Sequence, residues 1–448
     1  QAFKDAFFNS VYGETAGQWA YNTAVAWPLL LISVVFAVVF GYLYLFVIRL
    51  LGGLIIWVSF GIIVLTEAAG GCYTWFYLRP QYEPSDPTYD YLAYGSYTLW
   101  GLAGLTVFLL CCCYNAVKLG IAIFKTTAKY VQDTMQIFLL PMWSTVAASL
   151  WFALWFGSAI FIFSVGTPAP REGYEFITEV MWDKYTRWVF LYHVFGLFWI
   201  NAFIIGSAQF IIGASAVIWY FECNTDTKGK GSVTRGFYWL VRYHIGSLAF
   251  GSFVIAVCQM IRFLFEYYRR KLGTMSKEIK IVKILLCLTG YLLWLMEKCV
   301  KYMTKNAYIQ IALTNEGFCK AAWNGYALMI KHAHRFGFGN SIGTIYLVFG
   351  CMCIAATTSF TSYMILTNSG TWLPVTDPIP PVVVIAIVSA TIGALFLSIF
   401  SFSSDAILQA FLLDEELRFL GGNRPETMQE FAVAMKSRGQ GKCECQCF

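Results

Sequence analysis

Charged residues are scarce in this sequence. Asp, Glu, Lys and Arg make up only 12% of its 448 residues, against about 25% in ordinary soluble domains. Hydrophobic residues reach 58%, the mean hydropathy is +0.61, and 18% of the residues are aromatic, which is more than a soluble core needs. This balance excludes an ordinary soluble domain and predicts an all-α polytopic membrane protein.

Signatures of catalysis and of metal or nucleic-acid binding are missing as well. The sequence has no phosphate-binding loop, no Ser-His-Asp set and no metal-ligand spacing, and the pair His332-x-His334 has too few acidic neighbours for a metal centre. No basic run is interleaved with exposed aromatics. We therefore expect no enzyme activity, no cofactor or metal, and no nucleic-acid partner.

Long apolar runs predict a helical bundle of about nine membrane spans. Arg49, Gly52 and Gly53 predict a tight turn between the first two of them. The sixth and seventh runs either both cross the membrane or both stop short, and the seventh is expected to continue as one long helix through Ala312. The nine runs are about 26–48, 54–78, 96–124, 137–165, 188–221, 244–267, 281–296, 341–366 and 380–402.

The charges between these runs suggest an orientation. The Lys-rich or Arg-rich segments 118–133 and 222–241 are expected to be inner loops, whereas the acidic, proline-rich segment 79–95 is expected outside. Residues 317–338 form a basic, amphipathic segment that fits the inner membrane surface, where anionic lipids lie. The expected division is 1–25 as the end of an outer loop, 26–404 as the transmembrane domain that includes 317–338, and 405–448 as a cytosolic tail whose cysteines Cys443, Cys445 and Cys447 leave lipidation open.

Three stretches resemble the choline transporter-like family of solute carriers. The first is RYHIGSLAFGS at 242–252, and the second is EKCVKYMTKNAYIQIA at 297–312, followed by Phe318-Cys319. The third is looser and comprises Tyr192-His193, Phe195-Gly196, Trp199, Phe203 and Gln209. Where family members carry an acid near Trp199, this chain has Asn201 and Ala202.

The resemblance implies a carrier of choline or a similar quaternary or primary amine such as ethanolamine. Alternating access, either facilitated or proton-coupled, would move the substrate across the plasma membrane or an organelle membrane. It also implies about ten spans in the family, so a first span would be absent from this chain, which begins at Gln1 without a signal peptide. The alternatives are a structural or assembly subunit with this fold, or a carrier of another cationic cofactor; the oligomeric state stays open.

Glu67 is the sharpest polar signal in the apolar runs. An isolated carboxylate in hydrocarbon is costly, so Glu67 is expected to face a bundle interior, a cavity or a partner. It is a candidate for a cation or proton site. A neutral carboxyl group bonded to a neighbouring helix is the other reading.

A choline headgroup has a permanent charge and no N–H donor, so aromatic faces are its natural partners. Trp199 and Tyr192 are seven residues apart and share a helix face, Trp151 lies on the fourth run, and Gln209 is a candidate for the substrate hydroxyl. Any one tryptophan is more often a core-packing residue or a residue of the membrane interface than a substrate contact.

The remaining candidates are two histidines and the polar residues of the second stretch. His193 and His244 are candidates for proton coupling, because histidine titrates near neutral pH; a structural, hydrogen-bonded role is the alternative. Asn306 and Tyr308 lie in the second stretch and suit either substrate contact or the pairing of helices within the membrane.

Overall fold

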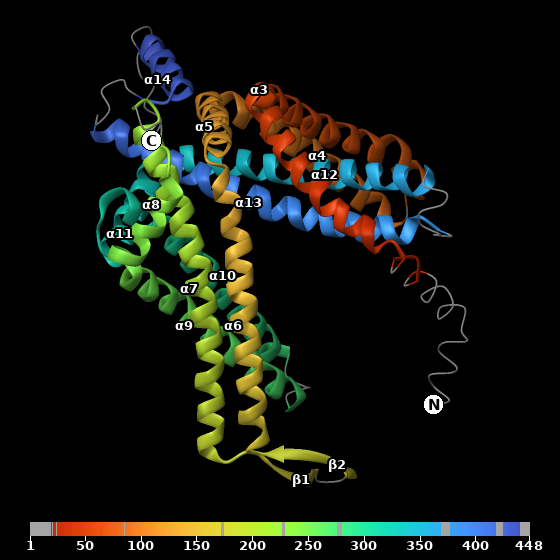
Figure 1. The fold of residues 1–448 in the computed structure, drawn as a ribbon. Helices are drawn as coiled ribbons and strands as arrows, with labels where there is room; N and C mark the ends of the chain where they lie inside the picture. The colour runs from red at the N-terminus through yellow and green to blue at the C-terminus, as the bar shows by residue number, and fades with distance from the viewer. Residues whose placement is uncertain are drawn as a thin grey trace. The chain divides into compact units, whose positions relative to one another are not determined.

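The structure, a computed structural model, describes residues 19, 21–23, 25–84, 86–171, 174–225, 229–275, 280–368, 377–417 and 424–439. Helices account for nearly all of this part of the chain (Figure 1). They are α3 (Trp27–Tyr73), α4 (Pro87–Cys112), α5 (Tyr114–Asp133), α6 (Leu139–Ser164), α7 (Lys184–Glu222), α8 (Ser232–Trp239), α9 (Ile245–Met275), α10 (Lys280–Thr314), α11 (Phe318–Lys331), α12 (Ala333–Asn368), α13 (Ile379–Leu417) and α14 (Glu426–Gly439).

Short elements complete the fold. The π-helical turn η1 (Thr74–Leu78) follows α3, and the π-helical turn η4 (Leu240–His244) precedes α9. The 3-10 turns are η2 (Arg79–Gln81) and η3 (Met135–Phe138). An antiparallel hairpin of β1 (Thr167–Arg171) and β2 (Tyr174–Met181) joins α6 to α7 and pairs Thr167 with Met181.

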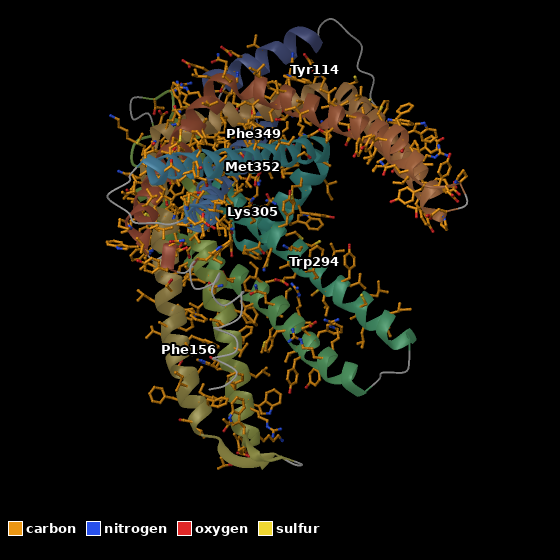
Figure 2. The ribbon with its side chains drawn as sticks, turned by 90° about the vertical axis from the view of Figure 1, so that its right-hand side faces the viewer. Tyr114, Phe156, Trp294, Lys305, Phe349 and Met352 are labelled. Carbon is orange, nitrogen blue, oxygen red and sulfur yellow. The ribbon has the colours of Figure 1, made fainter. Side chains whose placement is uncertain are left out.

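The predicted all-α multi-pass membrane protein is confirmed. Many large apolar side chains are exposed, including Phe156, Trp294 and Met352, as expected of surfaces that face lipid (Figure 2). Within the described residues, seven helical stretches are long and apolar enough to cross a membrane: Trp27–Gln81, Pro87–Cys112, Met135–Ser164, Lys184–Glu222, Ser232–Arg270, Ala333–Asn368 and Ile379–Leu417. The total number of crossings stays a prediction, although the predicted spans 26–48 and 54–78 lie in one continuous helical stretch.

The tight turn predicted at Arg49, Gly52 and Gly53 is wrong. Residues 27–73 form one helix of 47 residues, α3, about 70 Å long at about 1.5 Å per residue. Gly52 serves close packing instead, because a Cβ there would lie 3.0 Å from the Tyr346 hydroxyl. That hydroxyl donates a 2.6 Å hydrogen bond to the Gly52 carbonyl. A glycine pair was thus mistaken for a break in the helix.

The segment 118–133 is a helix, α5, and not the predicted loop, and the span predicted at 96–124 ends at Cys112. The prediction rested on Lys118, Lys125 and Lys129, but their spacings of seven and four keep them on one side of a helix. Most of the rest of the helix is buried, with Val117, Phe124 and Ala128 among its apolar residues. An amphipathic helix therefore replaces both the end of the span and the loop.

The long helix predicted from 281 through Ala312 is confirmed as α10. The amphipathic segment 317–338 contains α11 and the first turns of α12. α13 continues past Asp405 to Leu417, with Phe411 and Leu412 buried, so the first part of the segment assigned to the tail is packed.

The described residues fall into two compact units. Unit 1 contains α3, α4, α5 as far as Gln132, α12, α13 as far as Leu408, and α14. Unit 2 contains α6 to α11 together with Gln409–Leu417.

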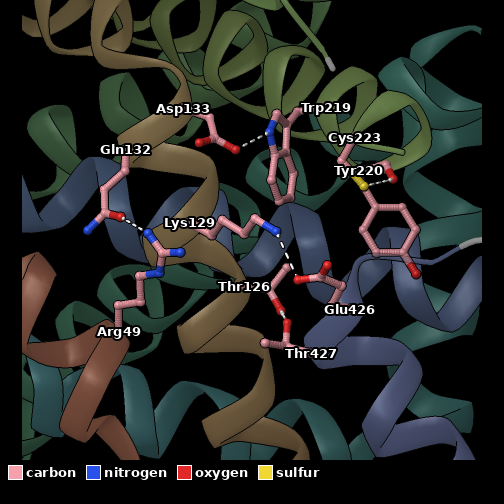
Figure 3. A network of polar contacts seen from close by, with 10 residues as sticks. All are labelled: Arg49, Thr126, Lys129, Gln132, Asp133, Trp219, Tyr220, Cys223, Glu426 and Thr427. Atoms are coloured by element: carbon pink, nitrogen blue, oxygen red, sulfur yellow. Dashed lines mark hydrogen bonds and ion pairs between the residues drawn. The ribbon is translucent and has the colours of Figure 1, made fainter. Parts of the chain in front are cut away.

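In unit 1, α14 is tied to α5. Lys129 pairs with Glu426 at 3.3 Å, and the hydroxyls of Thr126 and Thr427 share a hydrogen bond (Figure 3). Met428 on α14 is fully buried. The C-terminal helix is therefore a packed element of this unit.

In unit 2, apolar residues of α7, α9, α10 and α11 form a continuous core. Around Phe210 and Ile211 of α7 pack Leu248 of α9, Ile311 of α10 and Ala321 of α11. This core holds the helices that carry the three stretches singled out in the sequence.

Candidate functional site

Tyr308 is the residue at which the three stretches meet. Its buried hydroxyl donates to the Leu248 carbonyl at 3.4 Å and lies 3.3 Å from the hydroxyl oxygen of Ser252. A Cβ at Gly206 would lie 3.0 Å from the Tyr308 side chain, and one at Gly251 would lie 2.9 Å from its hydroxyl oxygen. A side chain at either position would therefore require the tyrosine to shift. We call these five residues the Tyr308 node.

Asn306, Gln310 and Gln409 form a second polar group, the amide ladder. Gln409 Nε2 donates to Asn306 Oδ1 at 2.7 Å, and Gln310 Nε2 donates to Gln409 Oε1 at 3.0 Å. All three side chains are 3% exposed or less. Each amide therefore has a partner on the other helix, which is the helix-pairing geometry expected of polar side chains inside a membrane bundle.

Glu297 links the first residues of the second stretch to α9. Its carboxylate accepts from Arg262 and from Lys301, each at 2.6 Å. The carboxylate is buried, and the two cations offset the cost of removing it from water.

Trp199 belongs to a group of three rings on α7 and α9, with Phe195 and Phe253, which we call the aromatic group. Ring centroids are 5.5 Å apart for Trp199 and Phe253, 5.7 Å for Phe195 and Phe253, and 6.1 Å for Phe195 and Trp199. The Trp199 indole N–H donates to the Ala249 carbonyl at 3.0 Å, which fixes the ring. Trp199 and Phe253 are 36% and 39% exposed, so part of each residue is accessible.

Tyr192 and Trp151 are not brought to the aromatic group. Tyr192 is 75% exposed and makes no ring contact with it in the described part of the chain. Trp151 is half-buried on α6, and its buried indole N–H has no acceptor among the described residues. Tyr192 and Trp199 share a helix face as predicted, but their rings do not form an aromatic cage together in the described part of the chain.

His193 of α7 stacks on Trp155 of α6 and forms hydrogen bonds with it. The rings are stacked at 5.0 Å with an interplanar angle of 6°, and the Trp155 indole N–H donates to the His193 carbonyl at 3.0 Å. His193 Nε2 lies 3.1 Å from the Trp155 carbonyl and 3.4 Å from Ser158 Oγ. Since a carbonyl only accepts, Nε2 carries a proton in this arrangement.

His244 and Gln209 lie deeper in unit 2. His244 is buried at the end of η4, with its ring 5.4 Å from that of Phe210. Gln209 is half-buried on α7 and has no hydrogen-bond partner among the residues that the structure describes.

Unit 2 also contains an apolar cavity of about 210 Å³ between α6, α7, α8 and η4. Its wall includes the rings of Trp143, Phe203 and Phe237 and the hydroxyl of Ser207. The Ser207 hydroxyl is buried and has no partner in the described part of the chain. No residue named above as a site candidate from the sequence lines this cavity.

Glu67, in unit 1, has a polar neighbour on the adjacent helix. Thr106 of α4 donates to Glu67 Oε2 at 3.3 Å. Glu67 is half-buried rather than enclosed. The geometry agrees with the expectation that this carboxyl group has a partner on a neighbouring helix.

Two residues of the site region, Gln409 and Phe253, were not predicted from the sequence. Gln409 lies in the segment assigned to the tail, although the apolar run continues through Phe411 and Leu412 and signals a longer helix. Phe253 directly follows the first stretch and carries no signal of its own. No group of three or more His, Cys, Asp or Glu side chains suited to a metal occurs among the described residues.

Comparisons with known proteins agree on one family. The profile of the plasma-membrane choline transporter family matches residues 97–416. Choline transporter-like protein 1 of Mus musculus is 24% identical over 425 residues, which cover 90% of this chain and 64% of that protein.

Two further relatives extend this result. Choline transporter-like protein 2 of Dictyostelium discoideum is 23% identical over 93% of this chain and 68% of its own length. Choline transporter-like protein 1 of Xenopus laevis is 27% identical over 66% of this chain and 45% of its own length. The chain thus spans about two thirds or less of the relatives it matches.

Proposed function

Because the chain belongs to the plasma-membrane choline transporter family, we propose that it carries choline across a membrane. The family is one of transporters and not of enzymes. The match over 97–416 is the observation that carries the proposal, since it includes all of the Tyr308 node, the amide ladder and the aromatic group. The plasma membrane is the membrane we propose.

We propose that the faces of the aromatic group contact the trimethylammonium group of choline. Ring faces attract a quaternary ammonium ion without needing hydrogen bonds. Ethanolamine has an ammonium group that must satisfy its own N–H donors, so three rings suit it less well. The Gln209 amide is the proposed partner of the choline hydroxyl, and alternating access is the proposed mechanism.

Uptake of radiolabelled choline into proteoliposomes tests the function. The full-length protein is the right sample, because this chain covers only 64% of the Mus musculus relative. We expect uptake above that of empty liposomes, with excess choline competing better than ethanolamine. Absence of uptake for both amines would contradict the transporter proposal and favour a structural or assembly subunit.

Two matched tryptophan substitutions test the site. Trp199→Leu should raise the apparent Kd for choline roughly thirtyfold, since a desolvated cation–π contact contributes about 2 kcal/mol. Trp199→Phe should retain part of the affinity. Trp143→Leu is the matched variant, because Trp143 lines the separate cavity. A larger loss from Trp143→Leu than from Trp199→Leu would move the site to that cavity.

Proton coupling, if present, is proposed to use His193, His244 or Glu67. Choline uptake is then measured with and without an imposed pH gradient in His193→Gln, His244→Gln and Glu67→Gln. A coupling residue should lose the stimulation by the gradient while exchange of choline without a gradient persists. Stimulation by the gradient in all three variants that equals that of the natural protein would exclude these residues.

We further propose that the C-terminus is cytosolic. Cys443, Cys445 and Cys447 lie outside the described residues and provide thiols for an impermeant reagent. Labelling is expected only after permeabilisation of the cells. The variant with alanine at these three positions is the control for labelling of other cysteines. Labelling in intact cells would contradict the proposal and indicate a C-terminus outside the cytosol.

A further inference from the structure

Arg79 is held between two aromatic rings in unit 1. Its guanidinium carbon lies 4.1 Å from the ring centroid of Trp75 and 4.1 Å from that of Tyr89. Trp75 belongs to the π-helical turn η1, and Tyr89 to the first turn of α4. The guanidinium carbon therefore lies over two aromatic rings, which offer no hydrogen-bond acceptor in the plane of the N–H donors.

Among the residues that the structure describes, the N–H donors of Arg79 have no acceptor. Its Nε is buried and has no hydrogen-bond partner, and no carboxylate pairs with the guanidinium among the described residues. Asp86, nearby in the chain, instead accepts from the backbone N–H of Thr88 at 2.8 Å. By contrast, the guanidinium groups of Arg235 and Arg262 each bond a glutamate.

The position of Arg79 along the chain indicates its surroundings. It lies two residues before the end of the apolar stretch Trp27–Gln81. The same end of α3 and the facing turns of α4 carry exposed aromatic residues, which are typical of the depth of lipid headgroups. They include Tyr73, Phe76, Tyr77, Tyr91, Tyr94 and Tyr97.

We propose that Arg79 binds a phosphate oxyanion, supplied by the headgroup of a membrane phospholipid. The guanidinium group offers a planar fork of N–H donors that matches two phosphate oxygens. The rings of Trp75 and Tyr89 fix the orientation of that fork before the ligand arrives, which reduces the entropy lost on binding. At headgroup depth, the phosphodiester is the abundant oxyanion. The site is separate from the proposed contacts for choline, whose positive charge Arg79 repels.

Binding of soluble short-chain lipids to the purified protein tests the proposal. Dihexanoyl phosphatidylglycerol, dihexanoylglycerol and inorganic phosphate are titrated in detergent, and affinity is measured by thermophoresis. We expect the phosphatidylglycerol to bind more tightly than either other probe. Arg79→Gln should weaken its binding about tenfold or more, the loss of a charge-assisted, two-bond contact.

Two further variants make the result decisive. Arg79→Lys keeps the charge but removes the planar fork, so we expect its affinity for the phosphatidylglycerol to lie between those of the natural protein and Arg79→Gln. This variant also tests the site if Arg79→Gln does not fold. Arg270→Gln is the matched control, because Arg270 is exposed and already bonds Glu266, and it should leave the affinity unchanged. Unaltered binding in both Arg79 variants, or equal binding of dihexanoylglycerol, would overturn the site. Equal affinity for inorganic phosphate would overturn the lipid as its source.

Discussion

The amide ladder of unit 2 and the contact of α3 with α12 in unit 1 hold helices together in different ways. In unit 2, polar side chains bond one another across helices, as Asn306, Gln310 and Gln409 do in the amide ladder. In unit 1, the buried contacts of α3 with α12 run from tyrosine hydroxyls to backbone carbonyls. Tyr44 donates to the Tyr346 carbonyl at 2.8 Å, and Tyr346 donates to that of Gly52.

This difference affects both stability and what a sequence reveals. A side-chain pair requires two particular residues, and losing either leaves the other buried without a partner. A bond to a helix carbonyl requires only one particular residue, and the carbonyl keeps its bond within the helix after the donor is lost. We therefore expect substitutions in the amide ladder of unit 2 to cost more than comparable ones at the bonds to helix carbonyls in unit 1.

The largest effect is expected from Gln409→Leu. It leaves Asn306 Oδ1 and Gln310 Nε2 buried and unpaired, and each unpaired group costs about 1–3 kcal/mol. The thermal unfolding midpoint in detergent measures the loss of stability. Ser389→Ala in unit 1 is the control, because the buried Ser389 hydroxyl bonds only carbonyls of its own helix. Equal destabilisation by the two variants would contradict the expectation that losing a side-chain pair costs more than losing a bond to a helix carbonyl.

Removing the whole ladder sharpens this test. The triple variant with Leu at 306, 310 and 409 leaves no unpaired amide, so it should be more stable than Gln409→Leu alone. If the triple variant is instead the least stable, the ladder contributes net stability and not only a penalty for unpaired groups.

The next largest effect is expected from overpacking in unit 1, as with Gly350→Ala. A Cβ at this position would collide with the ring of Tyr44, so neighbouring side chains must shift at a cost of about 1–3 kcal/mol. Gly61→Ala on α3 is the control, since nothing lies within 4 Å of its added Cβ. That variant should be neutral or gain up to about 1 kcal/mol from helix propensity. Two equal midpoints would show that unit 1 does not depend on close approach at glycine.

The same contrast explains which features the sequence predicted. The class, the membrane character and the long helix α10 follow from composition and apolar length, which depend on many residues at once. Gly52 was misread because a glycine in a turn and a glycine beneath a tyrosine look alike in one sequence. Only the distant partner, Tyr346, distinguishes them.

The site was predicted in part for a similar reason. Tyr308 lies in a long, specific stretch and is buried in unit 2, whereas Trp199 lies in the looser third stretch and is held by a bond to the Ala249 carbonyl. Phe253 and Gln409 contribute by position in space, which neither spacing nor residue type reveals. Tyr192 shares a helix face with Trp199, but it is 75% exposed and makes no ring contact with the aromatic group among the described residues.

Two tyrosine substitutions should have smaller and unequal effects. Tyr346→Phe removes one bond to a carbonyl, a change of about 1 kcal/mol. Tyr308→Phe removes a longer bond to the Leu248 carbonyl and also the contact with Ser252, whose hydroxyl loses a partner. The unfolding midpoint should therefore fall at least as far for Tyr308→Phe. Tyr42→Phe, on a half-buried ring of α3, provides a reference for loss of a hydroxyl. A greater loss from Tyr346→Phe would contradict the comparison.

The smallest effect is expected from a bond within a single helix, the cap of α4. The Asp86 carboxylate accepts the Thr88 N–H, and this bond lowers the pKa of the Asp86 carboxyl group below its ordinary value. Because the pKa is lowered in the folded state, the stabilisation is present above the ordinary aspartate pKa and is lost as pH falls through the lowered one. Asp86→Asn keeps a capping side chain but does not titrate. The natural protein should therefore have a slightly higher midpoint than Asp86→Asn at neutral pH, and the two midpoints should converge in acid. A difference that persists unchanged in acid would show that the charge of Asp86 does not contribute through this cap.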